Sequence, residues 1–141
     1  MIVREGKSVF KGVAIGKIFV YKKADNAVKK ETVADTAAEM ARFEAAKEKA
    51  LGQLKGLYEK ALKDVGEEEA MIFDVHQMLL DDPDYNDSIK DIIENEKMNA
   101  EYAVFMTSEQ FAAMFLSMDD DYMRGRAADI KDISERVISI L

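Results

Sequence analysis

Residues 66–83 of the chain read GEEEAMIFDVHQMLLDDP, and this stretch contains the start, body and end of one helix. The acidic run Glu67–Glu69 suits a first helical turn, because the positive end of the helix dipole attracts negative charge. The Asp82-Pro83 step ends this helix and starts another, since Asp is a favourable N-cap and Pro a favourable first helical residue. Apolar residues recur between these boundaries at helical spacing: Ile72, Val75 or His76, Leu79 and Leu80.

The sequence before this stretch divides into two parts of different composition. From about Thr32 to Val65 the apolar residues step by three and four, which predicts a long helix with one buried stripe. Gly66 is suited to end that helix. Residues 8–21 (SVFKGVAIGKIFVY) are instead β-branched, aromatic and interrupted by glycine, which is typical of strands.

Three further helices are predicted after Pro83. The first carries Ile89 on its apolar side, Asn99 is placed to cap the second, and Asp119–Asp121 precede the last. Five helical segments joined by short connections predict a mainly α fold. We expect a helical bundle of two helical hairpins, preceded by short N-terminal β-strands.

Composition excludes several classes of protein. The chain has 141 residues, a net charge of −8, one His and no Cys, so a disulfide framework and a Cys-based zinc site are excluded. The acidic balance disfavours nucleic acid and anionic membranes as partners. No apolar run reaches the roughly 18 residues of a membrane span, and the N-terminus lacks a secretory pattern. We therefore expect a cytoplasmic protein without a metal site.

His76 is the only side chain that titrates near neutral pH by default. It could accept a phosphoryl group or act as a base, or it could be an ordinary histidine at a helix surface or interface. Because a catalytic site needs several cooperating groups and none accompanies His76 in the sequence, we predict no catalytic residue.

Acidic residues are concentrated in the second predicted helix and around the Asp82-Pro83 step that starts the next one, where they flank Met78, Leu79 and Tyr85. Charge runs usually form a solvated face. Apolar anchors surrounded by charge also suit a protein-binding patch. Arg126 and Asp129 are three residues apart and can pair on a helix surface, or Arg126 could organise the acidic patch from a neighbouring helix.

Three motifs carry a resemblance to a known family. They are GVAIGK at 12–17, AMIFDVHQMLLDDP at 70–83, and MDDDYMR at 118–124 running into RAADIKD at 126–132. In this order they resemble Enzyme I of the bacterial phosphotransferase system (PTS), the phosphoenolpyruvate–protein phosphotransferases. The resemblance covers nearly the whole chain but only about the first quarter of the family's usual length.

The resemblance implies a division of labour between two subdomains. Residues 1–21 would be the first strands of an α/β phosphohistidine subdomain, and 22–141 the helical domain inserted after them, which docks the phosphocarrier protein HPr. The family's active histidine lies in a Gly-Gly-x-Thr-Ser-His motif, which does not occur here. This piece alone is therefore expected to be inactive and to hold no cofactor, the magnesium of the family belonging to a C-terminal domain.

The resemblance also implies a set of docking positions. Those that match the family's docking face are Glu67, Glu68, His76, Met78, Leu79 and Asp82, with Arg126 near it, while Asp84, Tyr85 and Phe115 occupy docking positions with altered side chains. The alternative is a structural or interaction module of another phosphoenolpyruvate-utilising enzyme. Unpaired strand edges in residues 1–21 could also cause self-association.

Overall fold

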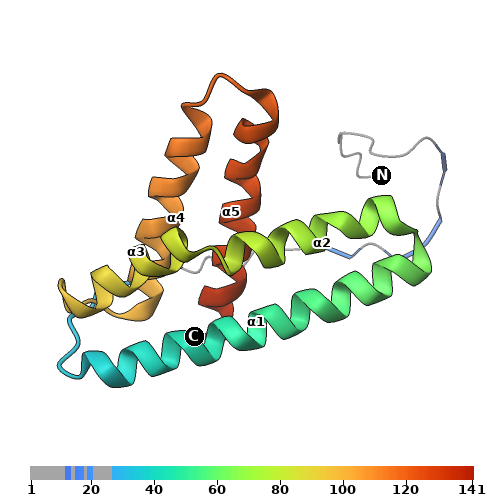
Figure 1. The fold of residues 1–141 in the computed structure, drawn as a ribbon. Helices are drawn as coiled ribbons and strands as arrows, with labels where there is room; N and C mark the ends of the chain where they lie inside the picture. The colour runs from blue at the N-terminus through green and yellow to red at the C-terminus, as the bar shows by residue number, and fades with distance from the viewer. Residues whose placement is uncertain (1–11, 14, 18, 21–26) are drawn as a thin grey trace, which may run out of the picture.

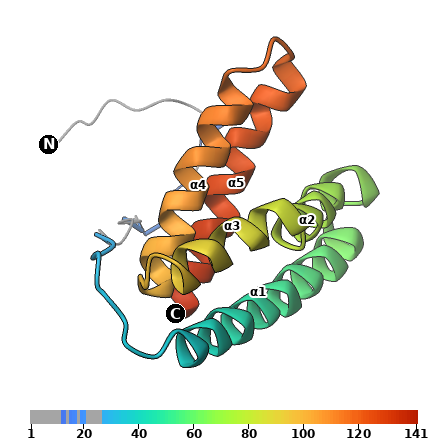
Figure 2. The ribbon, with the colours of Figure 1, turned by 60° about the vertical axis from the view of Figure 1, so that its left-hand side comes forward.

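Two helical hairpins cross in the computed structural model of the chain (Figure 1). The first hairpin pairs α1 (Thr36–Asp64) with α2 (Glu67–Leu80), and α3 (Pro83–Glu94) continues the course of α2. The second pairs α4 (Ala100–Leu116) with α5 (Asp121–Ile140). It stands steeply against the first hairpin in both views (Figures 1 and 2). The predicted mainly α bundle of two hairpins is confirmed.

The structure describes residues 12–13, 15–17, 19–20 and 27–141. The strands predicted within the first 21 residues therefore fall largely outside the described residues. The described positions before residue 27 form no strand, and Val13, Ile15 and Phe19 are exposed. The division into residues 1–21 and 22–141 stays a prediction.

Local sequence signals set the boundaries of α1, α2 and α3. Gly66 follows α1 with a φ of 112°, a conformation that favours glycine, and its N–H donates to the carbonyl of Ala61 at 3.1 Å. Asp82 caps α3 by accepting a hydrogen bond from the N–H of Tyr85 at 3.1 Å, with Pro83 as the first helical residue. Both predicted boundaries are confirmed.

The hydrophobic core lies where the two hairpins cross, and all five helices contribute to it. Because each hairpin buries its apolar side against the other, their crossing forms one continuous cluster. Its largest fully buried side chains include Phe43, Leu54, Leu80, Tyr85, Ile89, Ile93, Val104, Ile130, Ile133 and Val137.

One buried hydrogen bond joins α3 to α5 through this core. The hydroxyl of Ser134 donates to the carbonyl of Ile130 at 2.6 Å, so its proton is already used. The hydroxyl of Tyr85, 2.6 Å from Ser134 Oγ, is therefore the donor of the second bond. Burial raises the pKa of Tyr85 to about 12, so the phenol, protonated at neutral pH in any case, remains a donor well into the alkaline range.

This arrangement predicts unequal effects when either partner is removed. Ser134→Ala leaves the buried Tyr85 hydroxyl without an acceptor, which costs about 1–3 kcal/mol. Tyr85→Phe leaves Ser134 still bonded to Ile130 and costs about 1 kcal/mol or less. Urea unfolding of both variants measures the difference, and an equal or larger loss for Tyr85→Phe would contradict the assignment of the donor.

Candidate docking surface

The exposed side of α2 carries acidic and apolar residues predicted for docking. Glu67 and Glu68 are exposed in the first turn, Asp84 is exposed on α3, and Met78 is 68% exposed. These three carboxylates form no ion pair with the described residues of the chain. Among the described residues, α2 thus carries unpaired negative charge in its first turn and an exposed methionine near its end.

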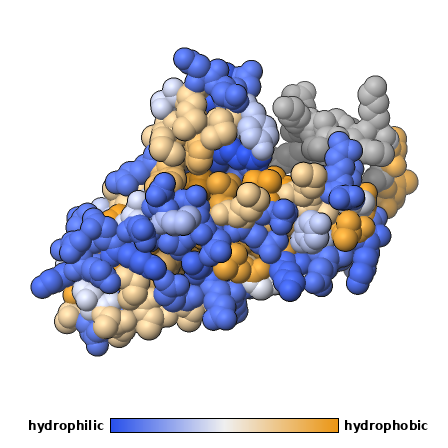
Figure 3. All heavy atoms as spheres, viewed as in Figure 1, coloured by the Kyte–Doolittle hydropathy of each residue, from blue (hydrophilic) through white to orange (hydrophobic). Residues whose placement is uncertain are grey.

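Other apolar residues of α2 extend this surface. Met71 is exposed and lies seven residues before Met78, so the two share one side of the helix. Ile72 and the partly buried Leu79 have the same spacing and share the side closer to the core. Figure 3 shows hydrophobic residues over α2 and in the angle between α2 and the upright hairpin, with hydrophilic residues around them.

The α5 side of this angle is organised by a chain of polar contacts. Nε2 of His76 on α2 lies 3.3 Å from Oδ1 of Asp129 on α5. Arg126 donates from Nη1 to the other oxygen, Oδ2 of Asp129, at 2.8 Å. The same guanidinium contacts the hydroxyl of Tyr122 and lies 4.3 Å from the centre of its ring. The predicted pair of Arg126 and Asp129 is present, and it reaches α2 through His76.

We call the surface made by these two sides the docking face: Glu67, Glu68, Met71, Met78, Leu79, Tyr122 and Arg126. Burial lowers the pKa of Arg126, but its hydrogen bonds with Asp129 and Tyr122 outweigh burial and raise the pKa above the ordinary value. The guanidinium is therefore charged and held in one orientation. Tyr122, at 67% exposure, covers it at the edge of the face.

Four of the predicted site residues are buried or committed to contacts within the chain. Tyr85 is fully buried and Phe115 is 8% exposed, so both belong to the hydrophobic core and neither side chain is free to contact a partner. His76 is 9% exposed and paired with Asp129, which is the environment of an interface histidine. Asp82 is committed to capping α3.

Sequence reasoning did not single out Tyr122, Asp129 and Met71 as site residues. The spacing of Arg126 and Asp129 was a usable local signal, but the contact of Asp129 with His76 joins residues 53 positions apart. Among the described residues, no group of His, Asp and Glu side chains is arranged to hold a metal ion. No helix in the described part of the chain is long and apolar enough to cross a membrane.

Comparison with known families identifies this arrangement. The family model described as "PEP-utilising enzyme, N-terminal" matches residues 5–126. The chain belongs to this family. The match covers α1 to α4 and the part of α5 that carries Arg126.

Relatives with the name phosphoenolpyruvate-protein phosphotransferase agree with this assignment. The one from Listeria monocytogenes is 44% identical over 137 residues, which are 97% of this chain and 24% of that protein. The one from Bacillus subtilis is 40% identical over 126 residues, or 89% of this chain and 22% of that protein. This member of the family thus spans about a quarter of the length of the phosphotransferases it matches.

Solved structures show the same fold. The solution structure of an Enzyme I (nEIt) protein superposes with a TM-score of 0.80 at 34% identity, covering 89% of this chain and 51% of that one. The N-terminal domain of a nitrogen Enzyme 1 superposes with a TM-score of 0.75 at 26% identity, covering 81% of this chain and 48% of that one. The resemblance to Enzyme I that the motifs predict is confirmed.

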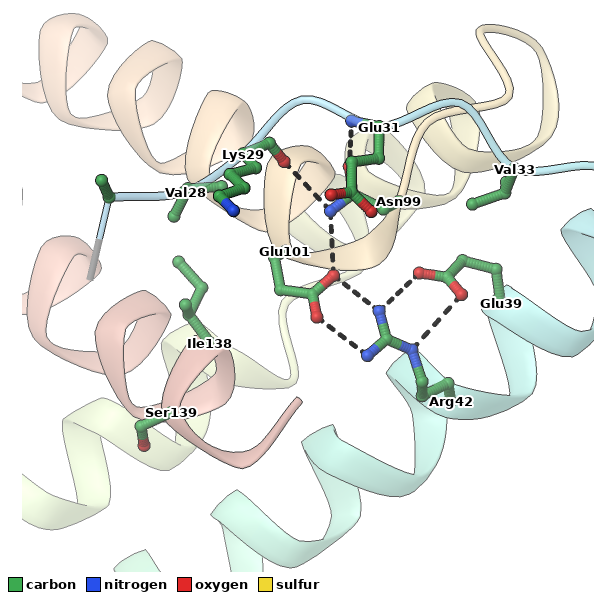
Figure 4. A pocket seen from close by; sticks show the side chains of 11 residues that line it. Val28, Lys29, Glu31, Val33, Glu39, Arg42, Asn99, Glu101, Ile138 and Ser139 are labelled. Carbon is green, nitrogen blue, oxygen red and sulfur yellow. Dashed lines mark hydrogen bonds and ion pairs between the residues drawn. The ribbon is translucent and has the colours of Figure 1, made fainter.

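This family member also has a pocket of about 840 Å³ away from the docking face, between the segment before α1 and the end of α5 (Figure 4). Arg42 lies in it between Glu39 and Glu101. It donates to both carboxylates and, from Nη1, to the carbonyl of Leu141 at 3.0 Å. All five N–H donors of Arg42 are thereby used, so none is left for an anionic ligand. The residues lining the pocket include Val28, Lys29, Glu31, Asn99, Ile138 and Ser139.

The contacts of Arg42 with Glu39, Glu101 and the carbonyl of Leu141 therefore hold these helices together, and we call them the Arg42 clamp. Glu39 also accepts a hydrogen bond from the N–H of Ala100 at 2.6 Å, which caps α4 from α1. Asn99 accepts from the N–H of Glu31 at 3.0 Å and donates to the carbonyl of Lys29 at 3.2 Å, which fixes the segment before α1 (Figure 4). The hydrogen bond with Arg42 lowers the pKa of Glu39. Burial alone would raise the pKa of Glu101, but its bonds with Arg42 and Asn99 lower it.

These pKa shifts predict how stability depends on pH. A lowered folded-state pKa stabilises the fold above the unfolded value, near 4.5 for Glu, and this contribution is lost as pH falls through the folded pKa. We expect Arg42→Met to be less stable than the natural chain above pH 5, with the gap in the free energy of unfolding narrowing as pH falls below the ordinary Glu value of 4.5. Urea unfolding at a series of pH values measures the gap.

Arg136→Met is the matched control, because Arg136 bonds to the side-chain oxygen of Gln53 instead of to a carboxylate pair. Its effect on the free energy of unfolding should change little over the same pH range. A gap for Arg42→Met that stays constant down to pH 3 would show that the two carboxylates are not stabilised by Arg42.

Proposed function

We propose that this helical domain is the site at which an Enzyme I docks HPr, the phosphocarrier protein of the phosphotransferase system. The complete enzyme would pass a phosphoryl group from phosphoenolpyruvate, through its own histidine, to HPr in sugar uptake. In this proposal the docking face holds the partner while a histidine outside residues 27–141 carries the phosphoryl group. The cytoplasm is the compartment in which we expect this transfer.

The exposure of Met78 on the same helix as Glu67 and Glu68, which form no ion pair with the described residues, is the observation that carries the proposal. An apolar side chain that is 68% exposed adds little to folding, whereas it can fill a pocket on a partner. Met and aromatic residues are enriched in the cores of protein interfaces. The docking face offers both, with Met71, Met78 and Tyr122 exposed on it.

The charge of the face sets the chemistry of its partner. Glu67 and Glu68 form no ion pair within the described chain, so a basic partner would gain their attraction without breaking existing contacts. The family resemblance implies that HPr presents basic residues around an apolar patch, which is complementary to this face. Long-range attraction would raise the association rate and weaken with salt.

The alternative is a structural or interaction module of another phosphoenolpyruvate-utilising enzyme. Burial of Glu68, Met78 and Leu79 in the core would favour a purely structural role. Glu68 and Met78 are instead exposed and Leu79 is partly buried, which supports docking. Phosphoryl transfer by His76 finds less support, since its ring is buried and in contact with Asp129.

Met78→Ala tests the apolar anchor. We expect HPr from a PTS of the same family to bind the natural domain and to bind this variant about tenfold more weakly, as for an interface residue worth about 1.4 kcal/mol. Leu62→Ala is the matched control, because Leu62 is also an exposed apolar residue but lies on α1, outside the docking face. Its dissociation constant should stay within about twofold of the natural value.

Titration calorimetry at about 50 and 300 mM salt provides the measurement. Binding that weakens with salt supports the acidic face as the docking site. A folded natural domain that fails to bind HPr at low salt would rule out the proposed function. Equal losses for the Met78 and Leu62 variants would place the docking site elsewhere.

A further inference from the structure

Asp129 occupies a position between the two hairpins that charge pairing on α5 alone does not explain. Its side chain is 15% exposed, and its two oxygens have different partners. Oδ1 lies 3.3 Å from His76 on α2, while Oδ2 accepts the hydrogen bond of Arg126 on α5 at 2.8 Å. One carboxylate therefore connects a residue of each hairpin.

The partners of Asp129 connect the core to the exposed surface. His76 is buried and its ring meets Phe73 edge-on, with centroids 6.5 Å apart. Arg126 is 15% exposed and stacks against Tyr122, which is 67% exposed. The order His76, Asp129, Arg126, Tyr122 thus runs from beneath the docking face to its edge.

Without the carboxylate, both neighbours would lose their orientation. A free arginine side chain samples many rotamers, and ordering it on binding costs about 1–2 kcal/mol of side-chain entropy. Arg126 would retain its contact with Tyr122, but Tyr122 is itself largely exposed and has no other polar contact in the described chain. His76 would remain buried with its Nε2 unsatisfied.

We propose that Asp129 is a positioning residue of the docking face. It does not touch the partner. Its two oxygens contact His76 and Arg126, one from each hairpin, and so hold Arg126 and the Tyr122 ring stacked on it in the orientation that the partner meets. This inference rests on the proposed docking function and adds to it a residue that acts through its neighbours.

Asp129→Asn tests the inference, because the amide keeps the shape of the side chain but removes its charge and one acceptor. Asp132→Asn is the control, since Asp132 is exposed on the same helix three residues further on. We expect Asp129→Asn to weaken HPr binding about tenfold and Asp132→Asn to change it less than twofold. The folding of both variants is checked by circular dichroism and urea unfolding.

Nitrogen chemical shifts measured by NMR report the local contacts of His76 and Arg126, and a general loss of stability does not change them in a folded domain. The imidazole signals of His76 and the Nε–H signal of Arg126 should change in Asp129→Asn and stay unchanged in Asp132→Asn. If Asp129→Asn is folded and these signals match the natural domain, Asp129 does not orient its neighbours and the inference fails. Changed signals with natural affinity would overturn it as well.

A double-mutant cycle with Arg126→Ala identifies the route of the effect. If Asp129 acts through Arg126, replacing Asp129 should weaken binding far less in the Arg126→Ala background than in the natural one. Fully additive losses would contradict this.

The failure of the proposed function and the failure of this inference give different results. A natural domain that does not bind HPr refutes the proposed function. A natural domain that binds HPr, with an Asp129→Asn variant of unchanged affinity, refutes only the positioning role. If Asp129→Asn fails to fold, Asp129→Glu replaces it, because the longer side chain keeps the charge but displaces both oxygens, and natural affinity for that variant overturns the inference.

Discussion

The geometry of this domain depends on the clamp around Arg42, where one guanidinium joins three segments that are distant in sequence. Its partners are Glu39 on its own helix, Glu101 at the start of α4 and the carbonyl of Leu141 after α5. Each contact comes from a different part of the two crossing hairpins. Because a planar fork with five donors accepts only a narrow range of geometries, the clamp limits how the second hairpin can stand on the first. The clamp thus adds a directional constraint to the angle that the packed core sets between the hairpins.

The docking face combines features that folding alone does not favour. Met71, Met78 and Tyr122 are exposed, while their neighbours His76 and Asp129 are largely buried. Exposed apolar groups gain nothing from folding, and buried polar groups require partners. In this domain the buried polar groups do have partners, since His76 contacts Asp129. Asp129 in turn bonds to Arg126, whose guanidinium stacks on the exposed Tyr122 ring. Because these contacts already fix the orientation of the side chains, less conformational entropy is lost when a partner binds.

Local signals in the sequence were sufficient for the helices and insufficient for the site. Gly66 and the Asp82-Pro83 step encode helix ends in neighbouring residues, so both could be predicted. Helical spacing also separated Tyr85, which lies in register with the buried Ile89, from the exposed Met78, but it could not predict that Tyr85 bonds to Ser134 on α5. The exposure of Met78 and Glu68 on α2 agrees with the predicted patch, whose docking role stays a proposal. The contact of His76 with Asp129 was not predictable, since no sequence period relates α2 to α5.

The contacts of Asn99 were likewise not predictable from neighbouring residues. The capping of α4 makes the stability of its first turn depend on α1. Asn99 has the sequence of an N-cap, but its side chain binds the segment before α1, and Glu39 caps α4 in its place. A helix whose first turn is completed by a residue 61 positions away cannot gain that stabilisation by local folding. The N–H of Ala100 would exchange with solvent whenever α1 separates from α4. Exchange at this one amide thus reports the separation of α1 from α4, although the amide belongs to a helix end, where fraying normally dominates.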